Sequence, residues 1–157
     1  MSANKTEGIK IICQNKKAHF EYELGERFEA GLVLVGTEVK SLRMGKANLL
    51  DAYARIEHGQ AWLSGAHITP YNNAGYGNHD PQRRRKLLLH RQEIKRLLGK
   101  VQEKGRSLIP LRLYFKNGLA KVELALARGK KLHDKRHTLK EADSKRDMER
   151  AIRERNQ

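Results

Sequence analysis

The chain has 157 residues, enough for one ordinary domain with an appendage. Its 33 Lys and Arg outnumber 18 Asp and Glu, and the formal charge of +15 favours a polyanionic partner. No apolar run approaches the roughly 20 residues of a membrane span, residues 1–7 lack the apolar core of a signal peptide, and the single Cys13 cannot form an internal disulfide, so we expect a cytoplasmic protein with no membrane partner.

The N-terminal part of the chain predicts strands and one short helix. We expect an irregular segment over residues 1–15. Alternating apolar residues over 19–35 predict strand structure, broken in two at Leu24-Gly25-Glu26. Thr37 is a plausible N-cap for a helix over 38–44.

Residues 51–68 predict a β-hairpin that turns at His58-Gly59. We expect Trp62 to share one face of the return strand with Ala66 and Ile68. A loop rich in turn-forming residues follows this hairpin.

The next elements have clearer patterns. Four basic residues, 83–86, precede a predicted helix over 87–104, whose apolar residues recur with helical spacing. Residues 107–127 predict a second hairpin, because Asn117-Gly118 suits a tight turn with positive φ.

These elements predict a mainly β fold, a small closed barrel of about six strands over residues 1–127, because closure removes exposed strand edges. Residues 128–157 carry 11 Lys and Arg against 6 Asp and Glu and few large apolar residues. Thr138 and Glu141 match a capping box. We expect a basic C-terminal tail that is disordered alone, or helical when an acidic surface supports it.

Sequence patterns for catalysis are weak. Gly31 and Gly36 have the spacing of a phosphate-binding loop, but Thr37 stands where that loop needs Lys. His133 and His137 lack a third ligand nearby, and Cys13 has no adjacent base. We therefore predict neither an enzyme nor a metal site.

Positive charge concentrates at Lys16-Lys17, at Arg43 with Lys46, at 83–86 and at 129–136. Each cluster alone could be a solvated face, but several clusters at strand ends suit a phosphate backbone. Three Phe, five Tyr and one Trp are too few for stacking base after base, which favours a folded RNA over an unstructured strand.

Two further residues have open interpretations. Glu29 could accept a hydrogen bond from a base or a ribose hydroxyl, or be an ordinary surface carboxylate. Leu88 could be an exposed apolar wedge, or a core leucine.

An ordered set of short motifs over about residues 9–140 resembles the small protein B family, the SsrA-binding proteins of trans-translation. The matching stretches are Asn15-Lys16-Lys17-Ala18, Phe28-Glu29-Ala30-Gly31, Glu38-Val39-Lys40-Ser41-Leu42-Arg43, Gly45-Lys46-Ala47-Asn48, Ile68-Thr69-Pro70, Arg85-Lys86-Leu87-Leu88-Leu89, Lys116-Asn117, Lys121-Val122 and Gly129-Lys130-Lys131 with His133-Asp134-Lys135-Arg136. The order makes the set far more specific than any single motif.

The resemblance implies an OB-type barrel of six strands, with no cofactor and no chemistry of its own. The implied partners are tmRNA, the stalled 70S ribosome including small-subunit rRNA, and elongation factor Tu on alanyl-tmRNA, with no role for DNA. The implied tmRNA-binding residues are Asn15, Lys16, Lys17, Glu29, Arg43, Lys46, Leu88, His90 and Lys121.

The resemblance also implies a ribosome-binding tail that occupies the decoding centre and the empty mRNA channel. Its residues are Gly129, Lys130, Lys131, His133, Asp134, Lys135 and Arg136. At position 90 the family often has Asn, so the role of His90 is open. Two alternatives also stay open, a constitutive ribosomal protein and an RNA-processing nuclease.

Overall fold

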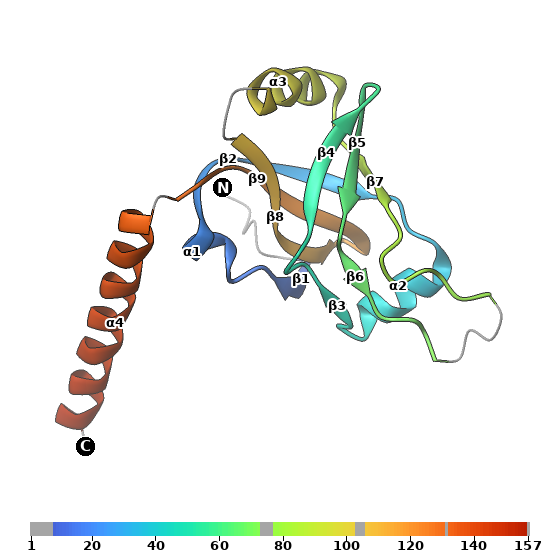
Figure 1. Cartoon of the computed structure of the whole chain (residues 1–157). Coiled ribbons are helices and arrows are strands. Elements are labelled where there is room, and N and C mark those ends of the chain that lie inside the picture. Colours follow the sequence, from blue (N-terminus) through green and yellow to red (C-terminus); the bar gives the residue numbers. More distant parts are fainter. Residues whose placement is uncertain (1–7, 73–76, 103–105, 131, 157) are drawn as a thin grey trace, which may run out of the picture.

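The computed structural model describes residues 8–72, 77–102, 106–130 and 132–156, and it shows a mainly β body from which one long helix projects (Figure 1). The predicted mainly β class is confirmed. The strands are β1 (Ile9–Gln14), β2 (Tyr22–Leu32), β3 (Ala47–Asn48), β4 (Tyr53–Glu57), β5 (Gln60–Ser64), β6 (His67–Ile68), β7 (Arg85–Leu88), β8 (Arg106–Lys116) and β9 (Leu119–Gly129). The helices are α1 (Ala18–Glu21), α2 (Gly36–Arg43), α3 (Arg91–Val101) and α4 (Leu132–Arg155).

Six strands pair with one another in a ring. Their order is β8-β4-β5-β7-β2-β9, and β9 pairs back onto β8. Strand β1 adds to β8 outside this ring, and β3 with β6 makes a separate two-stranded sheet. The ring satisfies strand edges that an open sheet would expose.

The core lies inside the ring. Alternation in β2 turns Phe28, Ala30 and Leu32 inward, while Leu97 of α3 is fully buried. Helix α3 lies across one end of the ring (Figure 1). A smaller cluster on the outer side of β8 and β9 is covered by Ala18 of α1. Only part of the outer surface of those two strands is therefore available to a partner.

Two predictions for the N-terminal region are wrong. Residues 9–14 are not irregular, because they form β1 and pair with β8, from Ile9 opposite Lys116 to Gln14 opposite Arg112. The expected break at residues 24–26 is instead a register shift within a continuous β2, between Leu24 and Arg27. Such a bulge accommodates extra residues and bends a strand without ending it.

The predicted helix over 87–104 begins only at Arg91. Residues 85–88 form β7, in which Leu87 lies opposite both Leu32 and Ala61. A short apolar run fits a buried strand as well as a helix, so periodicity did not separate the two. The helix starts where Glu93 Oε1 accepts a hydrogen bond from the His90 backbone N–H at 3.1 Å.

Helix α2 also begins earlier than predicted, at Gly36, so Thr37 is not its N-cap. The backbone N–H of Val35 donates to Glu38 Oε1 at 2.9 Å. The Thr37 hydroxyl instead lies 2.8 Å from His79 Nδ1. This contact between Thr37 and His79 joins residues 42 positions apart in the chain, so the local sequence around Thr37 does not reveal it.

Both predicted hairpin turns are confirmed by positive φ at His58-Gly59 and Asn117-Gly118. The predicted face of Trp62 is wrong. Ala61 and Leu63 are buried, whereas Trp62 lies opposite Arg55 on the outer face. The two-residue turn sets the register, and a shift of one residue reverses every side chain.

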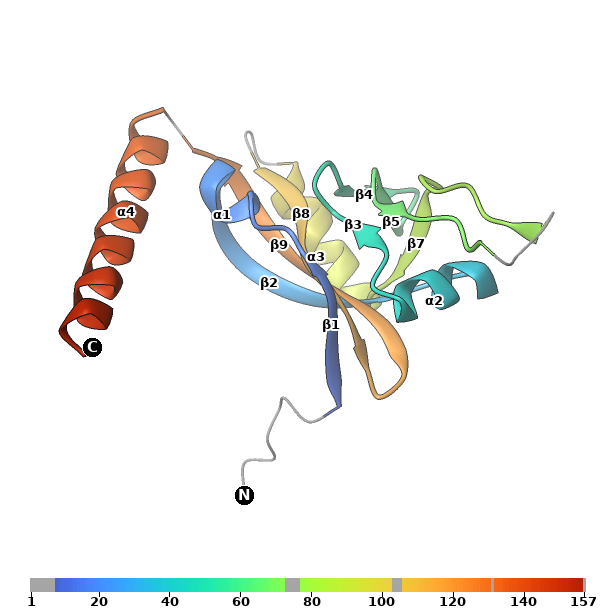
Figure 2. The ribbon, with the colours of Figure 1, turned by 90° about the horizontal axis from the view of Figure 1, so that it is seen from below.

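The tail is helical over Leu132–Arg155 and stands away from the body (Figure 2). Thr138 lies inside this helix, so the predicted capping box is wrong. Lys130 ties the start of the tail to α1, because its Nζ donates to the His19 carbonyl at 2.9 Å and to Thr138 Oγ1 at 2.7 Å. None of the helices in the described part of the chain is long and apolar enough to cross a membrane.

Candidate nucleic-acid interface

The outer face of β2, β9 and β8 carries a connected set of charged side chains. Antiparallel register places Glu29 opposite Glu123, and Lys121 opposite both Gly31 and Tyr114. Side chains two apart share a face, so alternate residues of the three strands gather there. The residues of this outer face are Arg27, Glu29, Arg112, Tyr114, Lys116, Lys121 and Glu123.

Glu29 organises one half of the outer face. Its carboxylate accepts hydrogen bonds from the Tyr114 hydroxyl and from Lys116 Nζ, the latter at 3.4 Å. The Tyr114 hydrogen bond, with the charges of Lys116 and Lys121, lowers the pKa of Glu29. Burial and the same hydrogen bond raise the pKa of Tyr114. Glu29 is thus an anion that orients a phenol and an ammonium group on a basic surface.

Glu123 organises the other half. Its carboxylate is 3.2 Å from Arg27 Nη1 and 3.0 Å from Arg112 Nη2. The guanidinium of Arg112 also lies over the Tyr114 ring, 5.0 Å from its centroid. Two guanidinium groups are thereby held in place with further N–H groups available to an anion.

A pocket of about 510 Å³ adjoins these arginines. Asn15 lines it and is 6% exposed, with Nδ2 donating to the Pro110 carbonyl at 3.1 Å. Its Oδ1 has no hydrogen-bond partner among the described residues. Asn15 therefore fixes the turn that leads to the exposed Lys16 and Lys17, and it keeps one acceptor unused. The pocket is lined by Gln14, Asn15, Lys16, His19, Arg27, Leu111, Arg112 and Glu123.

Leu88 extends the outer face on its other side. It is 54% exposed, so it is not a core leucine. It lies opposite Gly31, and a Cβ added at Gly31 would come within 3.2 Å of Leu88 Cβ. Gly31 thus leaves room for Leu88 beside Lys121, and His90 is exposed two residues further on.

The structure brings Glu29, Leu88 and Lys121 together on neighbouring strands, and the turn with Asn15 and Lys16 adjoins them at the pocket beside Arg27 and Arg112. Arg43 and Lys46 lie elsewhere, at the end of α2 and in the turn after it. Lys46 lines a separate pocket with Ser41, Met44, Pro70, Tyr71 and Asn72. Sequence reasoning missed Arg112, Tyr114 and Lys116. Alternation in the second hairpin could have placed those three residues on one face.

The basic cluster at 83–86 is divided by the sheet. Arg83 and Arg85 both bond to the carboxylate of Glu38. The side chains of Arg85 and Glu38 are fully buried. Although burial raises the pKa of Glu38, hydrogen bonds from Arg83, the Val35 backbone and Arg85 bring it below its ordinary value. Arg83 and Arg85 therefore hold α2 to the start of β7, with Arg83 still 36% exposed, while Arg84 and Lys86 have no bond to Glu38.

The tail residues are placed in part. Gly129 ends β9 and lies opposite Tyr22. Lys131 lies outside the described residues. His133, Asp134 and Lys135 belong to the first turn of α4, and Arg136 is exposed on the next.

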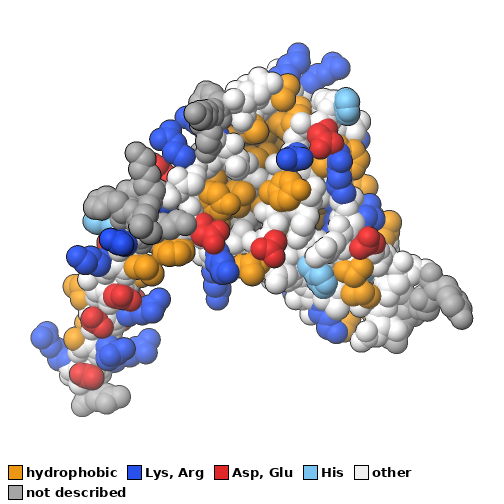
Figure 3. All heavy atoms as spheres, viewed as in Figure 1, with side chains coloured by type: hydrophobic (Ala, Val, Ile, Leu, Met, Phe, Trp, Pro, Cys, Tyr) orange, Lys and Arg blue, Asp and Glu red, His pale blue; other side chains and the backbone are white. Residues whose placement is uncertain are grey.

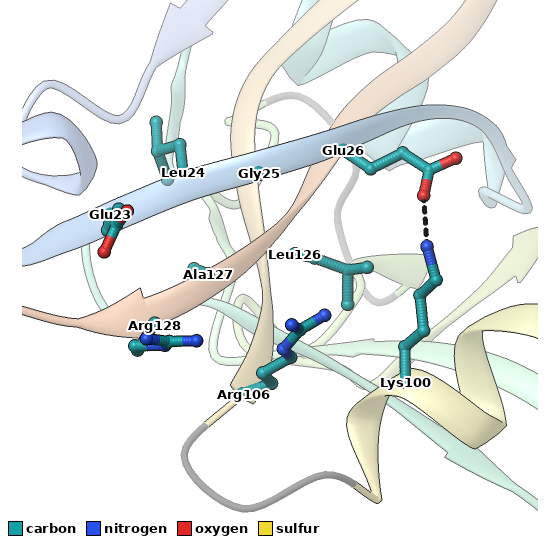
Figure 4. A pocket seen from close by; sticks show the side chains of 9 residues that line it. All are labelled: Glu23, Leu24, Gly25, Glu26, Lys100, Arg106, Leu126, Ala127 and Arg128. Carbon is teal, nitrogen blue, oxygen red and sulfur yellow. Dashed lines mark hydrogen bonds and ion pairs between the residues drawn. The ribbon is translucent and has the colours of Figure 1, made fainter.

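Charged and apolar side chains are interspersed on the face seen in Figure 3, and Lys and Arg lie among acidic residues along the tail. A pocket of about 220 Å³ at the β2 bulge contains Glu26 (Figure 4). Lys100 and Arg96 hold the Glu26 carboxylate at 2.6 and 2.8 Å, and the Lys100 hydrogen bond lowers its pKa. A carboxylate kept ionised in this way is a poor general acid.

Cys13 packs against the core, and burial raises its pKa to about 11. The described residues contain no group of three or more His, Cys, Asp or Glu that could hold a metal ion. Neither observation offers a reactive centre.

Comparison with known proteins found one family. A family model described as "SmpB protein" matches residues 12–154. An SsrA-binding protein of Syntrophobacter fumaroxidans is 57% identical over 160 residues, covering 100% of this chain and 99% of the relative. An SsrA-binding protein of Geobacter metallireducens is 61% identical over 148 residues, covering 94% of this chain and 97% of the relative.

A solved structure is also similar. It is described as "tmRNA-SmpB: a journey to the center of the bacterial ribosome", and its matching chain is 52% identical with a TM-score of 0.65. The match covers 76% of this chain and 85% of the other.

Proposed function

The chain belongs to the SmpB protein family, and from that premise we propose that it binds tmRNA and acts with it on stalled ribosomes in trans-translation. The observation that carries the proposal is the outer face of β2, β8 and β9, continued by Leu88 and the Asn15–Lys16 turn. This surface joins residues from distant parts of the chain into one basic surface with ordered donors.

The surface suits recognition of a folded RNA by shape and phosphate contacts. Lys121, Arg112 and Lys16 offer positive charge to phosphates, while Glu29 offers an acceptor to ribose hydroxyls or base N–H groups. Asn15, whose Oδ1 is buried, would act by holding the turn that presents Lys16. Leu88 offers an apolar contact beside them. We propose Lys17, Arg43, Lys46 and His90 as flanking contacts to the same RNA.

Within this proposal the ring of six strands acts as a closed OB-type barrel over residues 1–127, and residues 128–157 act as a separate ribosome-binding segment. The tail from Gly129 to Arg136 would occupy the decoding centre, and the rest of α4 the empty mRNA channel. Elongation factor Tu would join through alanyl-tmRNA. The protein would contribute binding and placement, with no catalysis of its own.

A binding comparison tests the proposal. Filter binding with tmRNA, ordinary tRNA and a random RNA of equal length, at two salt concentrations, should show a clear preference for tmRNA at physiological ionic strength. Affinity without preference would contradict the proposal, because charge alone gives unselective binding.

Two controls address other classes of protein. Incubation with labelled RNA and a divalent metal should give no cleavage, whereas a nuclease would cut. On sucrose gradients a rescue factor should be present on a minority of ribosomes, whereas a constitutive ribosomal protein would match subunit stoichiometry.

A further inference from the structure

The outward half of the basic cluster, Arg84 and Lys86, belongs to a second face of the body. In the sheet, Trp62 lies opposite both Arg55 and Lys86. Alternation buries Ala54, Ala61, Leu63, Arg85 and Leu87 and turns their neighbours outward. The Trp62 face, as we name it, consists of Tyr53, Arg55, Trp62, Arg84 and Lys86 on β4, β5 and β7 and in the turn before β7.

Arg84 is fixed within the Trp62 face. Its Cζ lies 4.3 Å from the centroid of the Trp62 ring, and Nη2 donates to Glu57 Oε2 at 2.7 Å. Its side chain is nevertheless 44% exposed. A guanidinium held against an aromatic ring loses little further freedom when its remaining N–H groups bind a phosphate.

Two more cations stand beside Arg84. Arg55 Cζ lies 5.5 Å from the Tyr53 ring centroid, and within the described part of the chain no carboxylate pairs with Arg55 or Lys86. Three cations on this face therefore meet a single carboxylate, that of Glu57. Positive charge with aromatic side chains is complementary to nucleic acid.

The Trp62 face is continuous with the proposed tmRNA surface. Lys86 and Leu88 are two residues apart on the outward side of β7, and Leu88 already borders Gly31 and Lys121. An RNA that covers Leu88 meets Lys86 next. This continuity favours the same RNA over a second one.

We propose that the Trp62 face extends the RNA-binding surface around β7, with Arg55, Arg84 and Lys86 contacting phosphates of the same tmRNA molecule that Lys121 contacts. This inference rests on the proposed function. It adds about a third of the ring to the surface covered by RNA.

Charge-removing variants test the proposal. Arg55→Gln and Lys86→Gln should each weaken tmRNA binding about three- to tenfold and reduce the salt slope by about one. Lys95→Gln, an exposed lysine of α3 with the same loss of charge, is the matched control and should change affinity less than twofold. Arg55 is exposed and Lys86 is half-buried at the surface, so the Arg55→Gln and Lys86→Gln variants should fold normally.

Trp62, the only tryptophan in the chain, gives a second readout on the unaltered protein. Saturation with tmRNA should lower the quenching of its fluorescence by acrylamide, because RNA would cover the ring. Equal quenching of the free and the bound protein would overturn the inference.

The two proposals fail in different ways. If wild-type protein does not prefer tmRNA, the proposed function fails. If wild-type protein prefers tmRNA and Lys121→Ala weakens binding, while Arg55→Gln and Lys86→Gln bind as wild type does, only the Trp62 face is excluded. In that case ribosome binding by the same variants would show whether rRNA is the ligand instead.

Discussion

Glu29 and Lys121 lie on the same outer face, on the neighbouring strands β2 and β9, yet replacing them should affect RNA binding differently. Lys121→Ala should weaken tmRNA binding about three- to tenfold and reduce the salt slope by about one, because one phosphate contact is lost. Glu29→Ala frees Tyr114 and Lys116 from their shared acceptor, so it should weaken binding with the slope unchanged. Filter binding from 50 to 200 mM salt measures the affinity and the salt slope of each variant. Equal salt slopes in the two variants would argue against a phosphate contact at Lys121.

Glu38 pairs with the buried Arg85, so the effect of replacing Glu38 should appear in the free energy of unfolding. Glu38→Gln removes the carboxylate that pairs with the buried Arg85, and such a loss costs about 3–5 kcal/mol. Glu57→Gln breaks the exposed pair with Arg84, which should cost about 1 kcal/mol or less. Urea denaturation at pH 7 compares the two variants.

The pH dependence of Glu38 follows from its lowered pKa. A carboxylate whose pKa is lower in the folded protein stabilises the fold above its ordinary value of 4.5, and this contribution is lost as pH falls through the folded value. The stability gap between wild type and Glu38→Gln should therefore narrow below pH 4.5. A gap that stays constant down to acid unfolding would mean that the charge of Glu38 is not what stabilises α2.

Helix α4 has little to hold it in place except its first turns. Leu139, Met148 and Ile152 are half-exposed or more, so α4 lacks the tertiary packing that supplies most helical stability in proteins. Lys130 supplies the tie, through the His19 carbonyl and the Thr138 hydroxyl. We regard this lysine as what orients the tail relative to the body.

Lys130→Ala should loosen the tail and leave the ring intact. Amide hydrogen exchange over residues 136–142 should become faster, while exchange in β8 and β9 stays as in wild type, because those strands hydrogen-bond to each other. Lys140→Ala, a change on the same helix without that tie, is the control. Unchanged exchange in Lys130→Ala would mean that the tail is held by something other than this residue.

At the scale of the whole molecule, the proposed function assigns RNA binding to the ring and ribosome action to the tail. A chain that ends after Lys130 keeps β9 and the Lys130–Glu21 backbone hydrogen bond. It should bind tmRNA within about twofold of wild type and fail to support tagging on stalled ribosomes, because electrostatic RNA contacts on the ring are unchanged. A truncated chain that loses tmRNA affinity would show that the tail belongs to the RNA-binding surface.

Much of the architecture could be predicted from local pattern. The two-residue turns at His58-Gly59 and Asn117-Gly118 need positive φ, and period-2 alternation follows directly from the pleat. The net charge, the mainly β class and the family could likewise be predicted from the sequence, since each depends on residue types and their order. A helical tail was expected only with an acidic surface to support it, and the residue at which the helix starts was not predicted.

Tertiary structure alone decided the rest, because pairing between distant strands is set by register and burial. Leu87 and Leu88 became strand, because Leu87 pairs with both Leu32 and Ala61, and Trp62 turned outward once its hairpin register was set. Of four consecutive basic residues, Arg83 and Arg85 bond to Glu38, and only Arg85 is buried, while Arg84 and Lys86 have no contact with Glu38. Composition counts such charges equally, whereas the sheet sends alternate side chains to opposite faces and so separates structural cations from those that can meet RNA.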